Sequence, residues 1–185
     1  MNQLQKSFIY AHGSGDLPLM IRSCLTYVED KMKLYLLSSD VLPKIQWVIT
    51  ELLINGTKHS GTKESKLNIE FNETGVSIIR EDSGVPLSLM VNEGVQKLDW
   101  PLDGTMLDQQ FEIYRNGMDS LRIYTESKEK AIFQVTELAN IEMPLLLDTT
   151  SEHFGLMIIA KASDRFSYNY DIKTKRNIFK TTFNY

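Results

Sequence analysis

The sequence predicts an α+β sandwich in which a mixed β-sheet is covered on one face by helices. The order of the expected elements is the main reason: two amphipathic helices come early, strands fill the middle, and one late helix precedes a final pair of strands. The length agrees, because 185 residues are enough for one domain with a buried core.

An edge strand and two helices are expected in the first third of the chain. The edge strand covers Lys6 to Ala11, where apolar residues alternate weakly. The first helix begins near Pro18, a residue that the first helical turn tolerates. The second has the longest and best-phased apolar stripe, with Ser39 or Asp40 as its N-cap and Gly61 as its stop.

Short runs rich in β-branched and aromatic residues predict strands in the middle of the chain. Two of them flank a hairpin turn at residues 72–75, and two more flank Asn116-Gly117, a dipeptide typical of hairpin turns. A short helix is expected between these hairpins, over residues 87–96. The predicted strands are Leu67–Phe71, Val76–Ile79, Phe111–Tyr114, Leu121–Tyr124 and Ala131–Glu137.

The last part of the chain returns to a regular pattern. Apolar residues at helical spacing predict a helix over Phe154–Ser163. Two further runs, Phe166–Tyr170 and Ile178–Phe183, predict the final pair of strands.

Composition excludes several classes of protein. With 42% hydrophobic and 24% charged residues, the chain is typical of soluble globular proteins. A net charge of −4 argues against a general nucleic-acid binder. No apolar run could span a membrane, and the first 13 residues lack the order of a signal peptide. The single cysteine, Cys24, excludes an internal disulfide, and no Cys/His cluster predicts a zinc site. We therefore expect a cytoplasmic protein.

Three polar residues on the second helix could take part in chemistry. Glu51, Asn55 and Lys58 stand at i, i+4 and i+7, so they share one narrow line beside the apolar stripe. A solvated helix edge explains most triples of this kind. The alternative is a magnesium and phosphate site, because Asn offers an oxygen to Mg²⁺, Glu can deprotonate a nucleophile and Lys can contact phosphate.

Two further short segments have a simple structural explanation and a functional one. Asp82 and Gly84 follow a strand: they could form an ordinary turn, or Asp82 could accept a hydrogen bond from an exocyclic amine while Gly84 lets the backbone approach a ligand. Gly155 begins the late helix: it could mark a plain helix start, or the helix N-terminus could bind an anion.

Together these segments resemble the motifs of one superfamily. The run Glu51-Leu-Leu-Ile-Asn55-Gly-Thr-Lys58-His59 closely resembles the N box of the GHKL, or histidine-kinase-like, ATPases. Asp82-Ser-Gly84-Val-Pro86 resembles the G1 box, and Gly155-Leu156-Met-Ile-Ile resembles the G2 box. The similarity covers about residues 6–90 and 152–185 and is greatest to the anti-sigma-factor serine/threonine kinases. It implies the two-layer α/β sandwich known as the Bergerat fold.

The resemblance implies ATP and Mg²⁺ as cofactors and a role for each matching residue. Asn55 would hold Mg²⁺ between the ATP phosphates, and Glu51 would be the general base, acting on a partner's serine hydroxyl or on water. Asp82 would bind the adenine amine, with Gly84 shaping the pocket.

The remaining roles implied by the resemblance concern the phosphates and the last strand. Gly155 would offer backbone N–H groups to the phosphates, and Lys58 and His59 would lie near them. Thr181 or Thr182 would assist Asp82 at the adenine.

The implied function is transfer of the ATP γ-phosphate to a protein serine. The partner would be a sigma-like factor or a small antagonist protein, with neither nucleic acid nor membrane involved, and a homodimer is an option that the sequence leaves open. A sensor histidine kinase does not fit, since 185 residues leave no room for its dimerisation helix.

The motifs depart from the family pattern at two positions. Pro86 replaces the second glycine of the G1 box, which the anti-sigma-factor kinases tolerate, and His153 replaces the first glycine of the G2 box. Residues 91–151 match nothing in the family and would form an atypical insertion in the lid region of a single domain, 1–185. His153 and this altered lid region favour an alternative, a protein-binding regulator that has the same fold but does not depend on nucleotide.

Overall fold

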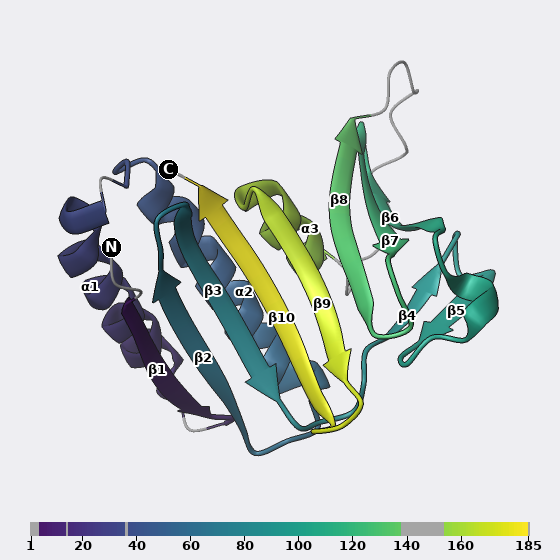
Figure 1. Ribbon diagram of the computed structural model, residues 1–185, viewed down its shortest axis with the longest axis horizontal. Coiled ribbons are helices and arrows are strands. Elements are labelled where there is room, and N and C mark those ends of the chain that lie inside the picture. Colours follow the sequence, from purple (N-terminus) through teal and green to yellow (C-terminus); the bar gives the residue numbers. More distant parts are fainter. Residues whose placement is uncertain (1–3, 14, 36, 138–153, 185) are drawn as a thin grey trace.

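A large antiparallel β-sheet dominates the structure, a computed structural model that describes residues 4–13, 15–35, 37–137 and 154–184 (Figure 1). Within these residues, eight strands pair in the order β1-β2-β3-β10-β9-β8-β7-β6, and every pair is antiparallel. The strands of this main sheet are β1 (Leu4–Ala11), β2 (Glu64–Phe71), β3 (Gly75–Asp82), β6 (Gln110–Asn116), β7 (Asp119–Thr125), β8 (Lys130–Glu137), β9 (Arg165–Asp171) and β10 (Arg176–Asn184).

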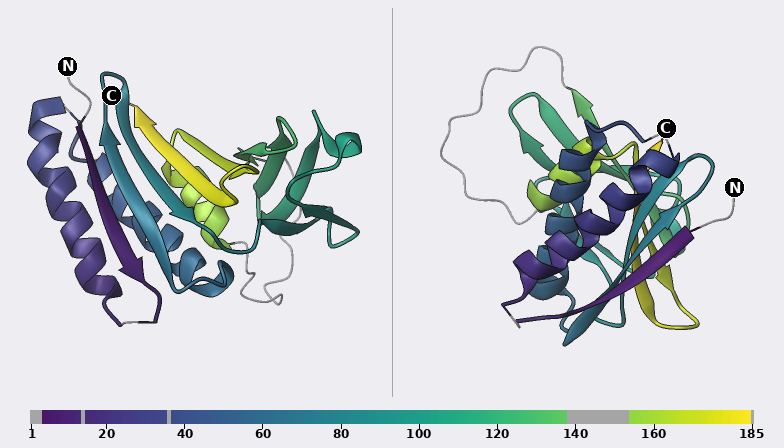
Figure 2. Two further views of the ribbon diagram at one scale, coloured as in Figure 1. Left: turned by 60° about the horizontal axis from the view of Figure 1, so that its bottom comes forward. Right: turned by 90° about the vertical axis from the view of Figure 1, so that its left-hand side faces the viewer.

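The helices pack on strands from different parts of the main sheet. The helices are α1 (Leu17–Tyr35), α2 (Val41–His59) and α3 (Phe154–Ala162). The first packs against β1 and β2, the second against β2, β3 and β10, and the third against β7, β8 and β9. Figures 1 and 2 show α1 and β1 at one end of the sheet. None of the helices in the described parts of the chain is long and apolar enough to cross a membrane.

The predicted fold class, a two-layer α/β sandwich with a mixed sheet and helices on one face, is wrong. Of the described residues, strands hold 43% and helices 31%, and the main sheet contains no parallel pair among these residues. The cause lies within residues 91–151. The strands β6, β7 and β8 of this segment are joined by short turns, and β8 pairs with β9, so they extend the antiparallel sheet.

The helix predicted over residues 87–96 is also wrong. This segment forms β4 (Ser88–Val91) and begins β5 (Gln96–Asp99), which pair as a separate hairpin. Three of the four residues between these strands, Asn92, Glu93 and Gly94, have positive φ angles, which a right-handed helix does not allow. Along β4 the side chains alternate between exposed and buried, the period of a half-buried strand.

The β4–β5 hairpin is tied to the rest of the molecule at both ends. At its base, where Trp100 N–H donates to the Leu87 carbonyl at 3.0 Å, Leu87 N–H donates in turn to the hydroxyl of Tyr168 on β9 at 3.0 Å. At its tip, Asn92 N–H donates to the carbonyl of Glu112 on β6 at 2.7 Å, and Glu112 N–H donates to Asn92 Oδ1 at 3.2 Å. A short 3₁₀ turn, η1 (Gly104–Met106), follows the hairpin.

The other predicted elements are confirmed, with boundaries that shift by a few residues. The strand expected over Lys6–Ala11 is the edge strand β1, and both expected hairpin turns are present, joining β2 to β3 and β6 to β7. Helix α2 starts after Asp40, although the Asp40 side chain makes no capping hydrogen bond, and it stops before Gly61, whose φ of +69° fits the expected terminator.

The apolar stripe of α2 packs into the core and fixes the helix above the sheet. Its fully buried members are Ile45, Val48, Ile49, Leu52 and Leu53. The sheet supplies the facing side chains, among which Leu67, Ile69, Phe71, Ile78, Phe166 and Tyr168 are almost completely buried. This packing sets the position of the polar edge of α2 relative to the end of β3.

Truncating a core residue of α2 should cost far more than truncating an exposed one. Ile49→Ala should lower the free energy of unfolding by about 2–5 kcal/mol, because it leaves a cavity at a fully buried position. The control, Trp47→Ala on the same helix, removes a side chain that is 57% exposed and should cost about 1 kcal/mol or less. Urea unfolding of both variants provides the test. Equal losses would contradict this placement of the helix.

Candidate functional site

A pocket of about 240 Å³ lies where the C-terminal half of α2, the end of β3, the start of α3 and the first residues of β10 meet. The loop from Val85 to Leu87 forms part of its rim. The polar lining residues are Asn55, His59, Ser60, Arg80, Asp82, Ser88 and Asn177, and the apolar ones are Val85, Pro86, Leu87, Leu89, Leu156 and Phe179.

The pocket brings together residues from the three sequence motifs. Asn55 and His59 come from the first motif, Asp82 from the second and Leu156 from the third. These segments are far apart in the chain, and the packing of α2 on β3 and of α3 on α2 joins them.

Glu51 and Gly155 lie directly beside Asn55. A Cβ atom built on Gly155 would be 2.5 Å from Glu51 Oε2 and 3.4 Å from Asn55 Oδ1. Any larger residue at Gly155 would have to displace the Glu51 carboxylate. Burial raises the pKa of Glu51 above its ordinary value of 4.5, and the charge of Lys58 only partly opposes this.

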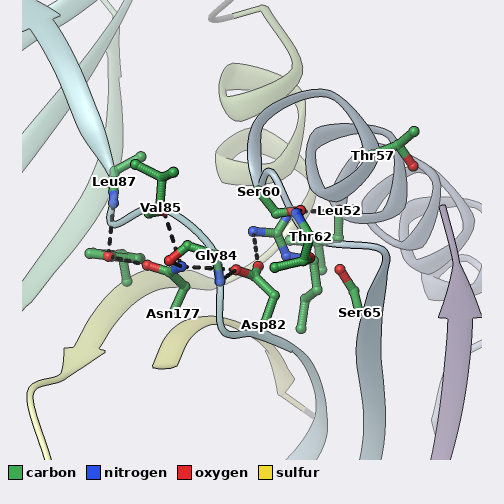
Figure 3. A network of polar contacts seen from close by, with 12 residues as sticks. Leu52, Thr57, Ser60, Thr62, Ser65, Asp82, Gly84, Val85, Leu87 and Asn177 are labelled. Carbon is green, nitrogen blue, oxygen red and sulfur yellow. Dashed lines mark hydrogen bonds and ion pairs between the residues drawn. The ribbon is translucent and has the colours of Figure 1, made fainter. Parts of the chain in front are cut away.

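The Asp82 carboxylate is held by three donors from different parts of the fold (Figure 3). Its Oδ1 accepts from the backbone N–H of Gly84 at 3.0 Å and from Asn177 Nδ2 at 2.8 Å. Its Oδ2 lies 2.9 Å from Nη2 of Arg80 in an ion pair whose side chains are almost fully buried. The carboxylate therefore has a fixed orientation in the pocket wall.

Arg80 is a buried cation at the base of the pocket. It is only 4% exposed, its Nη1 donates to the Leu52 carbonyl at 3.1 Å, and its guanidinium carbon lies 4.3 Å from the centroid of the Phe179 ring. Burial lowers the pKa of Arg80, and the charge of Asp82 opposes this shift. The contacts with α2, β3 and β10 hold the guanidinium in one place.

Asn177 and Tyr168 fasten the loop that forms the rim of the pocket. Asn177 Nδ2 donates to the carbonyls of Gly84 and Val85 at 3.3 and 3.1 Å. The Tyr168 hydroxyl donates to Asn177 Oδ1 at 2.7 Å and accepts from Leu87 N–H at 3.0 Å. Burial raises the pKa of Tyr168, so this hydroxyl keeps its proton and remains a donor.

Three buried polar atoms of the pocket residues lack hydrogen-bond partners. Among the described residues, five such side-chain atoms exist, and Asn55 Nδ2, Arg80 Nε and Asp82 Oδ2 belong to this one pocket. The Asp82 oxygen has its ion pair with Arg80 at 2.9 Å and no further partner among the described residues. Leaving a buried polar atom unpaired costs about 1–3 kcal/mol, so the cluster indicates polar atoms supplied by a ligand or by water.

Other predicted site residues lie outside the pocket lining. The Thr181 hydroxyl is fully buried and donates to the Ile78 carbonyl at 3.2 Å, and Thr182 points to the opposite side of β10. Lys58 is exposed on α2 and does not line the pocket. His153 lies outside the described residues.

Three residues of the site were missed by the sequence analysis. The strand register pairs Asn177 with Asp82, and a single sequence carries no signal for that register. Tyr168 was missed for the same reason. Arg80 had a signal, because a charged residue two positions before Asp82 in a buried strand must share its face.

No family model matches the chain, and no curated protein matches it. The case for a function therefore depends on the three motifs and on the contacts within the pocket.

Gly84 should tolerate no side chain. A Cβ atom at this position would overlap the backbone carbonyl oxygen of Ser60, which already accepts from Val85 N–H at 2.9 Å. Gly84→Ala should lower the free energy of unfolding by about 2 kcal/mol or more, because the backbone has to move.

The control for this substitution is Gly104→Ala, where a Cβ atom would meet nothing within 4 Å. It should change the free energy of unfolding by about 0.5 kcal/mol or less. If urea unfolding found Gly84→Ala as stable as Gly104→Ala, the close approach of the loop to α2 would be wrong.

Proposed function

We propose that this chain is an ATP-binding regulator of the anti-sigma-factor type, acting as a serine/threonine kinase on a small antagonist protein. The observation that carries the proposal is that Asn55, His59 and Asp82, from two separate motifs, line one pocket, with Glu51 beside it. The family resemblance implies that Asn55 holds Mg²⁺ and that His59 lies near the phosphates. It also implies that Asp82 binds the adenine and that Glu51 is the general base.

The pocket has the chemistry of a nucleobase site. Apolar side chains such as Leu87, Leu156 and Phe179 can cover the faces of a planar ring. Asp82 lies in the pocket wall, where its carboxylate can accept a hydrogen bond from the exocyclic amine of adenine. The ribose and phosphates would then extend along the polar edge of α2, towards Asn55 and Glu51.

The residues beside the pocket suit Mg²⁺ that is held mainly by the nucleotide. No group of three or more His, Cys, Asp or Glu side chains able to hold a metal exists in the described ranges. Mg²⁺ bound with ATP takes one or two protein ligands and completes its shell with phosphates and water. Asn55 would supply its amide oxygen to the ion. Its Nδ2 has no hydrogen-bond partner, so no bond at that nitrogen would hold the amide group in another orientation. The ion would neutralise charge on the phosphates during transfer.

Glu51 is suited to act as the general base. Its raised pKa strengthens its affinity for a proton, and the carboxylate stands at the junction of α2 and α3, next to Asn55. It would accept the proton of a serine hydroxyl as that oxygen attacks the γ-phosphate. The absence of a side chain at Gly155 leaves room for the carboxylate in this position.

The expected partner is a sigma-like factor or a small antagonist protein, in the cytoplasm. The negative net charge and the polar edge of α2 agree with a protein partner rather than a nucleic acid.

A specific observation favours a second candidate, a regulator that binds protein without nucleotide. The pocket volume of about 240 Å³ is below the ~300–1,000 Å³ of typical ligand pockets. In addition, Asp82 Oδ1 already accepts two hydrogen bonds from the protein itself.

Calorimetric titration with ATP and ADP, with and without Mg²⁺, separates the two candidates. The first predicts saturable binding that Asp82→Asn weakens at least tenfold and whose Mg²⁺ dependence Asn55→Ala removes. Circular dichroism of both variants controls for folding. No binding at millimolar ATP would reject the first candidate and support the second.

Substituting Glu51 should separate catalysis from binding. Glu51→Gln should lower the rate of phosphoryl transfer by about 10²–10⁴-fold and leave the Kd of ATP unchanged, because only the proton acceptor is lost. The wild-type rate should fall as pH decreases through the raised pKa of Glu51, so the acid limb of the profile lies above pH 4.5. Full kinase activity in Glu51→Gln would rule out this residue as the base.

A further inference from the structure

Arg80 is the strongest feature of the pocket that the proposed function leaves unused. A buried cation beside a buried carboxylate is costly to desolvate, and an apolar pair of similar volume would serve packing as well. Arg80 nevertheless lines the pocket.

The hydrogen-bonding capacity of this pair is only partly used. A guanidinium carries five N–H donors, and within the described residues the polar contacts of Arg80 are with the Leu52 carbonyl and with Asp82. Its Nε has no partner. On Asp82, Oδ1 accepts two hydrogen bonds, whereas Oδ2 has only the ion pair.

The wall of the pocket therefore holds a fixed donor next to a fixed acceptor, on two side chains that are almost fully buried. Nη2 of Arg80 and Oδ2 of Asp82 are 2.9 Å apart, so they are direct neighbours in the wall. The Leu52 carbonyl, the Phe179 ring and Asn177 hold both groups in place. A ligand that fits this wall must carry an N–H donor directly beside an acceptor.

Adenine has this order of groups and guanine has the reverse. The exocyclic amine of adenine is a donor, and the adjacent ring nitrogen, N1, is an acceptor. In guanine the corresponding atoms are a carbonyl oxygen and an N–H. Guanine in the same orientation would place its oxygen against the Asp82 carboxylate and its N–H against the Arg80 guanidinium, so both contacts would be repulsive.

We infer that Arg80 is a specificity-determining residue, whose guanidinium donates a hydrogen bond to N1 of the adenine base while Asp82 accepts from the amine. This inference rests on the proposed nucleotide function. Asp82 alone would bind any base with a suitably placed N–H, whereas Arg80 requires an unprotonated ring nitrogen beside it.

An ATP analogue in which N1 is replaced by C–H tests the inference on the unmodified protein. This analogue, 1-deaza-ATP, keeps the amine that Asp82 would bind and loses only the acceptor for Arg80. Its Kd, measured by calorimetry with Mg²⁺, should exceed that of ATP by about tenfold to a hundredfold, the effect of one hydrogen bond to a charged group. GTP should bind more weakly than either.

The outcomes distinguish this inference from the proposed function. Equal affinities for ATP and 1-deaza-ATP would overturn the role of Arg80 and leave the ATP site standing. No binding of either nucleotide at millimolar concentration would overturn both. Binding of GTP as tight as that of ATP would also contradict the donor–acceptor order assigned to the wall.

Two arginine variants complete the test. Arg80→Met should bind ATP and 1-deaza-ATP within about twofold of each other, because it removes the donor. Arg176→Met, which removes an exposed arginine of the same sheet that pairs with Glu81, should keep the full discrimination. If Arg80→Met does not fold, the analogue comparison on the unmodified protein still decides the question.

Discussion

The buried ion pair between Arg80 and Asp82 constrains everything around the pocket. Removing two charges from water costs several kcal/mol for each ion, so the fold has to surround both with compensating groups. Helix α2 supplies the Leu52 carbonyl, β10 supplies Asn177 and the Phe179 ring, and the loop after β3 supplies the Gly84 N–H. Each of these segments supplies a group that compensates one of the two buried charges.

The pair also explains why a short loop can form a well-defined pocket wall. Residues 83–87 have no regular secondary structure, yet their carbonyls and N–H groups are bonded to Asn177, Tyr168 and the end of α2. Because Asn177 contacts both the carboxylate and the loop carbonyls, the position of the loop and the orientation of Asp82 depend on the same side chain. The wall is therefore preorganised, which reduces the entropy that a ligand would lose on binding.

Local patterns were enough to predict most individual elements but not the architecture. The phased stripe from Ile45 to Leu53 identified α2, and Asn116-Gly117 identified the turn between β6 and β7, because each signal lies within a few residues. The fold class failed because the pairing of β8 with β9 joins segments separated by α3, and no local pattern encodes it. The helix expected at residues 87–96 failed because Asn92 and Glu93 adopt positive φ, which propensity does not foresee.

The same division between local and distant information holds for the candidate site. Glu51, Asn55 and Asp82 were found from motifs, and Arg80 could have been found from the alternation along β3. Asn177 was out of reach because it is opposite Asp82 only through the register of two strands that are 95 positions apart in the chain.

The position of the β4–β5 hairpin limits how far the pocket can open. Leu87 and Leu89 line the pocket, and they lead into a hairpin whose tip is bonded to the edge strand β6 through Asn92 and Glu112. The hairpin is thus fixed at both ends, by Tyr168 near the pocket and by β6 at its tip. A bulkier ligand that pushed Leu87 outward would have to break the hydrogen bond between Leu87 and Tyr168 or strain β6 at the edge of the main sheet. The shape of the pocket is therefore linked to the mechanical stiffness of β6.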